Sequence, residues 1–160
     1  MNNQDNPPFT LCKPGERPLL EIWHIGYGPN ISYGICVAEP PRAPETDLEL
    51  ERGQQTLVVR CAYPPGYPLA PPGPRGEEGS ITRAAFEELL EPLKHIRVPP
   101  FPGEEAFVCD GALYGFEVVL DSTRFSYQWH TIAPKGWEPV AEWLGGVIHQ
   151  LVQLTGASFP

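Results

Sequence analysis

A group of polar side chains in the last third of the chain has the residue types needed for proton transfer or anion binding. They share one face of a predicted hairpin and are Glu117, Arg124, Ser126, Gln128 and His130. A histidine, a carboxylate and an arginine that converge on a sheet face could form an acid–base or anion site. A solvated outer face explains the same pattern, because strands with one buried side place polar residues on the other. We favour this second interpretation.

A second group consists of carboxylates in a proline-rich stretch of the first half. Its members fall within thirteen positions and are Glu39, Glu45, Asp47, Glu49 and Glu51. On a strand, the three acids of residues 47–51 would line one face at a spacing of about 6–7 Å. No calcium-loop pattern surrounds them, so we expect no metal. Two roles stay open: an edge strand protected by its charge, and a surface that faces a basic protein partner. We adopt the partner-binding surface.

Other residues capable of chemistry fit structural roles better. The proline-rich residues 63–75 contain a P-x-x-P motif that could bind an aromatic groove, but a stiff loop is the simpler interpretation. His24 and His149 lack a second ligand at metal-binding spacing, so we interpret both as structural. The G-x-G of residues 26–28 lies in a hairpin with no helix after it, unlike a nucleotide fingerprint. With no other catalytic motif, we expect a non-catalytic protein without metal or cofactor.

The hydrophobic pattern predicts the elements that must position these residues. Alternating or apolar runs indicate strands at residues 19–27, 31–38, 47–51, 56–63, 106–109, 112–120 and 124–132. A period of 3.6 indicates one helix capped by Ser80 or Thr82 and a second helix over residues 137–154. Asp110-Gly111 between two apolar runs is a strong hairpin signal. Residues 64–79 are interpreted as a loop, and the paired Gly145 and Gly146 predict close packing of the last helix on the sheet.

This order of elements defines the expected fold. It is β-β-β-β-α-β-β-β-α, and short turns between strands indicate antiparallel pairing. The sequence therefore predicts an α+β protein with a twisted antiparallel sheet of about six to seven strands and two helices packed on one face. Residues 1–17 are expected to form a polar N-terminal arm, and residues 18–160 a single domain.

Charge and cysteine content restrict the partners and the compartment. The chain has 20 acidic and 11 basic residues and a net charge of −9, which disfavours nucleic acid and anionic membranes as partners. The first residues, Met-Asn-Asn-Gln-Asp-Asn-Pro-Pro, do not have the basic and apolar regions of a signal peptide, and no apolar run approaches the length of about 18–20 residues that spans a bilayer, so we expect neither a signal peptide nor a membrane span. The four cysteines, at positions 12, 36, 61 and 109, have no C-x-x-C spacing. We therefore expect a cytoplasmic protein with four reduced thiols, most of them small buried hydrophobes.

The segment Asp110-Gly-Ala-Leu-Tyr114, followed by Trp129 and by Pro134-Lys-Gly-Trp137-Glu-Pro-Val-Ala-Glu-Trp143, resembles a known pattern. It is similar to small bacterial proteins of unknown function and to immunity proteins encoded beside secreted polymorphic toxins. The resemblance covers residues 106–155 and implies a compact, acidic, non-catalytic protein that occludes the active site of a toxin. Such families share no functional residues that could be carried over to this chain.

These observations lead to two hypotheses of different classes. The first is a bacterial, cytoplasmic binding protein that neutralises a protein partner, a toxin domain with a basic surface, through the acids of residues 39–51. The second is a small enzyme or ligand-binding domain that uses the face of Glu117, Arg124, Gln128 and His130. An enclosed pocket around those four side chains would favour the second hypothesis.

Overall fold

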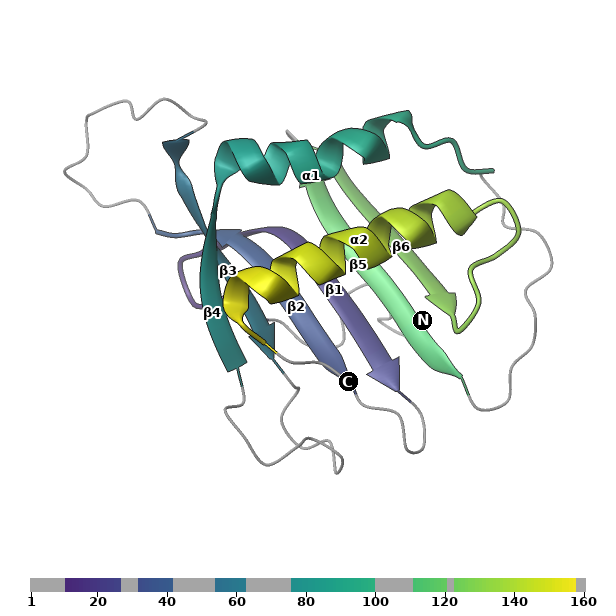
Figure 1. Cartoon of the computed structure of the whole chain (residues 1–160), viewed down its shortest axis with the longest axis horizontal. Helices are drawn as coiled ribbons and strands as arrows, with labels where there is room; N and C mark the ends of the chain where they lie inside the picture. The colour runs from purple at the N-terminus through teal and green to yellow at the C-terminus, as the bar shows by residue number, and fades with distance from the viewer. Residues whose placement is uncertain are drawn as a thin grey trace.

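The computed structural model describes residues 11–26, 32–41, 54–62, 76–99, 111–120 and 123–157. These residues form six strands and two helices (Figure 1), in the order β1 (Arg17–Gly26), β2 (Tyr33–Glu39), β3 (Thr56–Ala62), β4 (Gly76–Thr82), α1 (Arg83–His95), β5 (Ala112–Leu120), β6 (Thr123–His130) and α2 (Glu138–Thr155). The strands build one sheet in the order β4-β3-β2-β1-β5-β6, with antiparallel pairing throughout. The predicted α+β class is confirmed.

The assignment of residues 64–79 to a loop is wrong at its end, because β4 begins at Gly76. The sequence of β4, Gly-Glu-Glu-Gly-Ser-Ile-Thr, is rich in residues that strands disfavour. Its strand conformation depends on pairing with the apolar β3, where Ile81 lies opposite Leu57 and Gly79 lies opposite Val59. Residues 47–51, 63–75 and 106–110, which include two expected strands and the first residue of the expected turn, lie outside the described residues.

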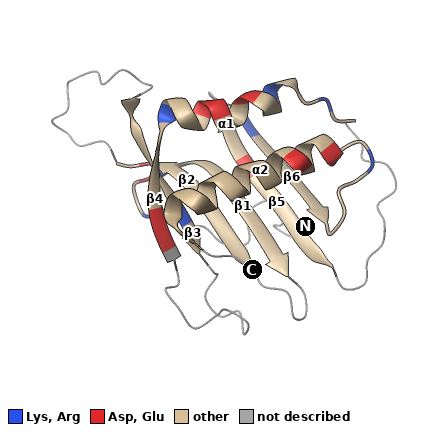
Figure 2. Cartoon of the chain, in the orientation of Figure 1, with Lys and Arg blue, Asp and Glu red and all other residues tan. Residues whose placement is uncertain are grey.

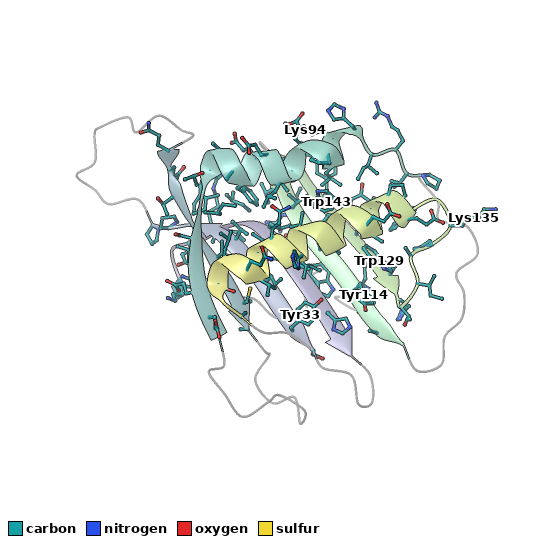
Figure 3. All side chains as sticks on the ribbon, in the orientation of Figure 1. Tyr33, Lys94, Tyr114, Trp129, Lys135 and Trp143 are labelled. Carbon is teal, nitrogen blue, oxygen red and sulfur yellow. The ribbon has the colours of Figure 1, made fainter. Side chains whose placement is uncertain are left out.

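Both helices cover the same face of the sheet, and the main core lies between these two layers (Figure 1). Helix α1 contributes Phe86 and Leu90, and α2 contributes Val140, Leu144, Val147 and Leu151, all buried. Thr82 caps α1 by accepting a hydrogen bond from the backbone nitrogen of Ala85, as one of the two predicted caps would. The Trp143 indole donates a 2.8 Å hydrogen bond to the Leu89 carbonyl, which fastens the helices together (Figure 3).

Gly145 and Gly146 lie on the exposed side of α2, so the expectation that they allow close packing on the sheet is wrong. A Cβ atom added at either position would meet no atom within 4 Å. Replacing either glycine with alanine is therefore expected to raise the free energy of unfolding by about 0.5–1 kcal/mol, because alanine restricts the unfolded chain and favours the helix. Urea denaturation of the single variants measures this change, and a loss of stability would contradict it.

Candidate functional site

The sheet face opposite the helices carries most of the polar strand residues. Because side chains alternate along a strand, the residues between the core positions of β1 to β5 point to this face. We call it the open face because neither helix covers it, although residues such as Glu21, Cys36 and Glu117 are buried there. The strand pairings place five of them in one row across the sheet: Glu78 opposite Arg60, Arg60 opposite Cys36, Cys36 opposite Glu21, and Glu21 opposite Glu117. The open face therefore joins charged groups and a thiol from five neighbouring strands.

Residues 11–16, which precede β1, are fastened to the open face by an ion-pair network. The Arg60 guanidinium donates two hydrogen bonds, of 2.5 and 2.7 Å, to the Glu16 carboxylate, whose side chain is 6% exposed. Arg60 Nε also donates to Glu78 at 2.8 Å, and Lys13 donates to the same carboxylate at 3.0 Å. This part of the expected N-terminal arm is thus a packed component of the fold.

The Arg60 contact gives the attachment of residues 11–16 a defined pH dependence. Hydrogen bonding to Arg60 lowers the pKa of Glu16 below its ordinary value of 4.5. A carboxylate whose folded pKa is depressed contributes stability above the unfolded pKa, and this contribution is lost as the pH falls through the folded pKa. The stability difference between the wild type and Glu16→Gln is therefore expected to be full at neutral pH and to shrink with acidification below about pH 4.5.

Urea unfolding at a series of pH values measures this difference. Glu87→Gln provides a matched control, because Glu87 is exposed and lies 3.8 Å from Arg83. Its effect on stability should be small at every pH. A Glu16→Gln difference that stays constant between neutral pH and pH 3 would contradict the role of the Glu16–Arg60 pair.

Two thiols and a carboxylate meet where residues 11–16 cross β1 and β2. Cys12, Glu21 and Cys36 each offer one ligand atom, and these three atoms lie within 4.8 Å of one another. The two sulfur atoms are 2.8 Å apart and share a hydrogen bond in which either thiol can be the donor. This bond lowers the pKa of Cys12 and, together with burial, raises the pKa of Cys36.

The cluster of Cys12, Glu21 and Cys36 was not predicted from the sequence. Its members come from three segments, so no spacing between neighbours in the chain indicates their contact. The one available signal was the alternation in β2, where Gly34, Cys36 and Ala38 occupy one side. Small side chains on one side of a strand leave room for a covering segment, which is the place that residues 11–16 fill.

The predicted ligand face is only partly assembled. Arg124 contacts Glu117, with 3.1 Å between Nη1 and Oε1, and the Glu117 side chain is 8% exposed while Arg124 is 61% exposed. Gln128 and His130 lie farther along β6, opposite Gly115 and Leu113, and both are exposed. Glu117 and Arg124 therefore form an ion pair at the sheet surface, and Gln128 and His130 extend away from it. This spacing does not favour a water-excluding catalytic site.

Glu39 lies outside any exposed acidic surface. Its carboxylate, 12% exposed, forms ion pairs with Arg17 and with the buried Arg83. Two arginines of the fold thus offset the charge of this residue of the predicted partner-binding surface. The other members of that surface, Glu45, Asp47, Glu49 and Glu51, lie outside the described residues.

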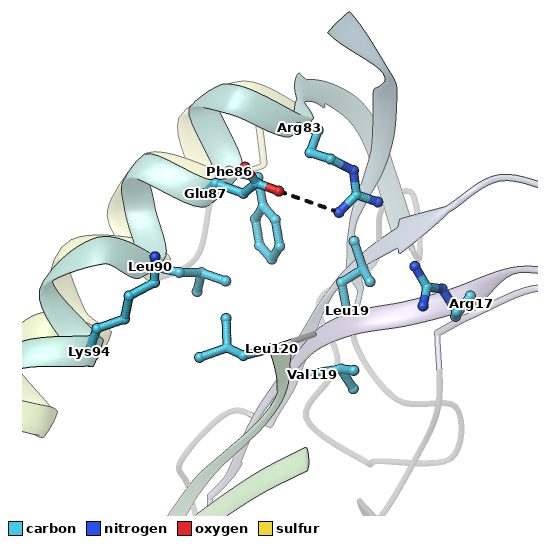
Figure 4. Close-up of a pocket in the computed structure, with 9 residues that line it drawn as sticks. All are labelled: Arg17, Leu19, Arg83, Phe86, Glu87, Leu90, Lys94, Val119 and Leu120. Carbon is cyan, nitrogen blue, oxygen red and sulfur yellow. Dashed lines mark ion pairs between the residues drawn. The ribbon is translucent and has the colours of Figure 1, made fainter. Parts of the chain in front are cut away.

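A cavity of about 310 Å³ lies between α1 and the adjoining ends of β1 and β5 (Figure 4). Apolar side chains form part of its wall, and three cations, Arg17, Arg83 and Lys94, lie around it. Each cation already contacts a carboxylate: Arg17 and Arg83 contact Glu39, and Lys94 contacts Glu91. An anionic ligand would have to displace these contacts, so the cations are better explained as partners of the acids beside them.

Comparison with known proteins shows no family: no family model and no curated protein matches the sequence. The resemblance to immunity proteins therefore stays a prediction. Within the described residues, neither helix has both the length and the apolar character needed to cross a membrane.

Proposed function

We propose that the chain is a non-catalytic binding protein that recognises a basic protein partner through the outer surface of its two helices. This surface, which we call the helical acidic face, consists of exposed carboxylates on α1 and α2: Glu87, Glu88, Glu91, Glu138 and Glu142. Figure 2 shows acidic residues on both helices and no lysine or arginine on α2. This distribution accords with the net charge of −9.

The observation that carries the proposal is the incomplete charge compensation at this surface, where two of the five carboxylates, Glu88 and Glu142, have no cationic neighbour in the described ranges. Glu87 lies near Arg83, and Glu91 contacts Lys94. Glu88 and Glu142 are exposed and form no ion pair with any residue in the described ranges. Uncompensated surface charge of one sign attracts a partner of the opposite sign over a distance of about one Debye length, roughly 8 Å in physiological salt. It would therefore chiefly accelerate the encounter between the partners.

The shape of α2 supports the same surface. Gly145 and Gly146 lack side chains on its exposed side, and no neighbouring atom fills the space that a Cβ atom would occupy. A partner could therefore approach the helix backbone closely between Glu142 and His149. For the identity of the partner we propose a bacterial toxin domain, on the strength of the resemblance in residues 106–155.

Neutralising the helical acidic face is expected to slow association with the partner. The test variant is Glu88→Gln/Glu142→Gln, and its matched control is Ser126→Lys/Gln128→Lys on the exposed β6. Both variants shift the net charge equally, at different places on the molecule. We expect the first to slow association by about tenfold at low salt, since local charge governs the electrostatically steered rate. The control should leave the rate nearly unchanged.

The measurement begins with capture of a stoichiometric protein from the native cell extract. Association kinetics with that protein at several salt concentrations then compare the wild type with both variants. If the partner is a toxin, its expression alone should arrest growth, and co-expression with this chain should restore growth. Equal slowing by both variants would assign the effect to net charge, and unchanged kinetics in the first variant would refute the proposed surface.

A further inference from the structure

The cluster of Cys12, Glu21 and Cys36 has the composition of a metal site. We propose that these three side chains bind a divalent transition-metal ion, with Zn²⁺ as the preferred ion. The three ligand atoms already lie within 4.8 Å of one another. Cys36 and Glu21 are 1% and 8% exposed, and Cys12 covers them from residues 11–16. Two ligands thus come from neighbouring strands of the sheet, and the third comes from the segment before β1.

The ligand types favour zinc over the hard cations. Thiolates select soft or borderline ions, whereas calcium and magnesium require sets of oxygen ligands. Zinc binds sulfur at about 2.3 Å and carboxylate oxygen at about 2.0–2.2 Å, in tetrahedral geometry. Two sulfurs on one tetrahedral ion would lie about 3.7 Å apart, so binding requires Cys12 and Cys36 to separate from their present 2.8 Å. Cys12 lies outside the helices and strands, which permits this shift.

The charges around the cluster also favour a cation. Arg60, which lies opposite Cys36 in the sheet, is neutralised by Glu16 and Glu78, and Arg124 is paired with Glu117. Glu21 lies directly opposite Glu117 in the sheet and close to both thiols. Binding of a divalent ion to both sulfurs would release the protons that the two thiols carry, and the ion would offset the negative charge of the thiolates so formed.

A disulfide between Cys12 and Cys36 is the competing interpretation of the short sulfur–sulfur distance. Its formation would need an oxidant, and the Glu21 carboxylate would take no part in the bond. The metal site instead requires the carboxylate as the third ligand and leaves one coordination position for water. The dependence on Glu21 therefore separates the two interpretations.

Cobalt titration of the full chain, purified under reducing conditions without metal, tests the site. Bound Co²⁺ should give the charge-transfer absorption of two thiolate ligands at one ion per chain, and added Zn²⁺ should abolish it. Cys12→Ser is the main variant, because Cys12 is half-buried and outside the regular elements. Loss of a residue that only supports a metal ligand lowers metal affinity by about 10–100-fold. Cys12→Ser and Glu21→Gln each remove a ligand itself, so we expect each to weaken Co²⁺ binding by at least as much.

Two controls match these variants. Cys61→Ser removes a buried thiol on the helix-facing side of the sheet, and Glu117→Gln removes the carboxylate opposite Glu21. Both should retain the stoichiometry and the thiolate absorption. Circular dichroism of each variant tests whether it is folded. Absence of the absorption band in the wild type, its persistence in Cys12→Ser or Glu21→Gln, or a Cys12–Cys36 disulfide that persists under the reducing conditions would each overturn the proposal.

Discussion

Substitution of Gly79 by alanine is expected to lower the free energy of unfolding by about 2–3 kcal/mol, because it forces a methyl group into a fully occupied space. A Cβ atom at this position would lie 2.4 Å from the Leu154 carbonyl oxygen and 2.9 Å from its carbonyl carbon. These are backbone atoms in the last turn of α2, so no side-chain rotation can relieve the contact. Strand β4 and the end of α2 would have to separate.

Thermal and urea denaturation measure this effect, which should lower the melting temperature by about 5–10 °C for a chain of this size. Gly146→Ala is the matched control, because the same methyl group is added to α2 in open space and should stabilise the protein. If Gly79→Ala is as stable as the wild type, the last turn of α2 packs less tightly on β4 than the structure indicates.

Replacement of Arg83 by methionine is expected to lower the free energy of unfolding by about 3 kcal/mol, because it leaves the Glu39 carboxylate with one partner fewer in a largely buried place. The Arg83 side chain is 6% exposed and contacts Glu39, and its Nε donates to the Gln55 side chain at 3.0 Å. The remaining partner of Glu39 is Arg17, whose side chain is 58% exposed and so compensates the charge less well.

The double variant Arg83→Met/Glu39→Gln should recover much of the stability, since the uncompensated charge disappears together with its partner. Glu91→Gln at the surface of α1, where both partners of the Lys94 contact are about half exposed, is the control and should have little effect. A double variant that is no more stable than Arg83→Met would show that Arg83 acts through packing and not through its charge.

The helices and most of the strands are predictable because their own residues carry the signal. The apolar positions Phe86 and Leu90, or Leu144, Val147 and Leu151, repeat with the helical period and are buried in the structure. Strand β4 has no such signal, because its glycines and acids become a strand only through pairing with β3. The expectation for Gly145 and Gly146 was wrong because a glycine pair does not reveal from the sequence which side of a helix faces the sheet.

The candidate sites were less predictable than the fold. The contact of Arg124 with Glu117 follows from neighbouring strands of a predicted hairpin, so the sequence could indicate it. The contact of Cys12 with Cys36 depends on the path of a segment without periodic pattern, and the ion pair of Glu39 with Arg83 depends on how α1 is placed beside β2. Such contacts are properties of the tertiary structure and have no local sequence signature.

Strand β1 pairs with β2 on one side and with β5 on the other, and this has a consequence for synthesis on the ribosome. Strands β1 to β4 follow one another in the chain and can pair as they emerge. The other edge of β1, where Leu20 lies opposite Val118, can pair only after β5 has been synthesised. Until then β1 exposes an unpaired, strongly apolar edge, the kind of edge that recruits other chains. Newly made chains should therefore be most prone to aggregation in the interval before residues 112–120 leave the exit tunnel.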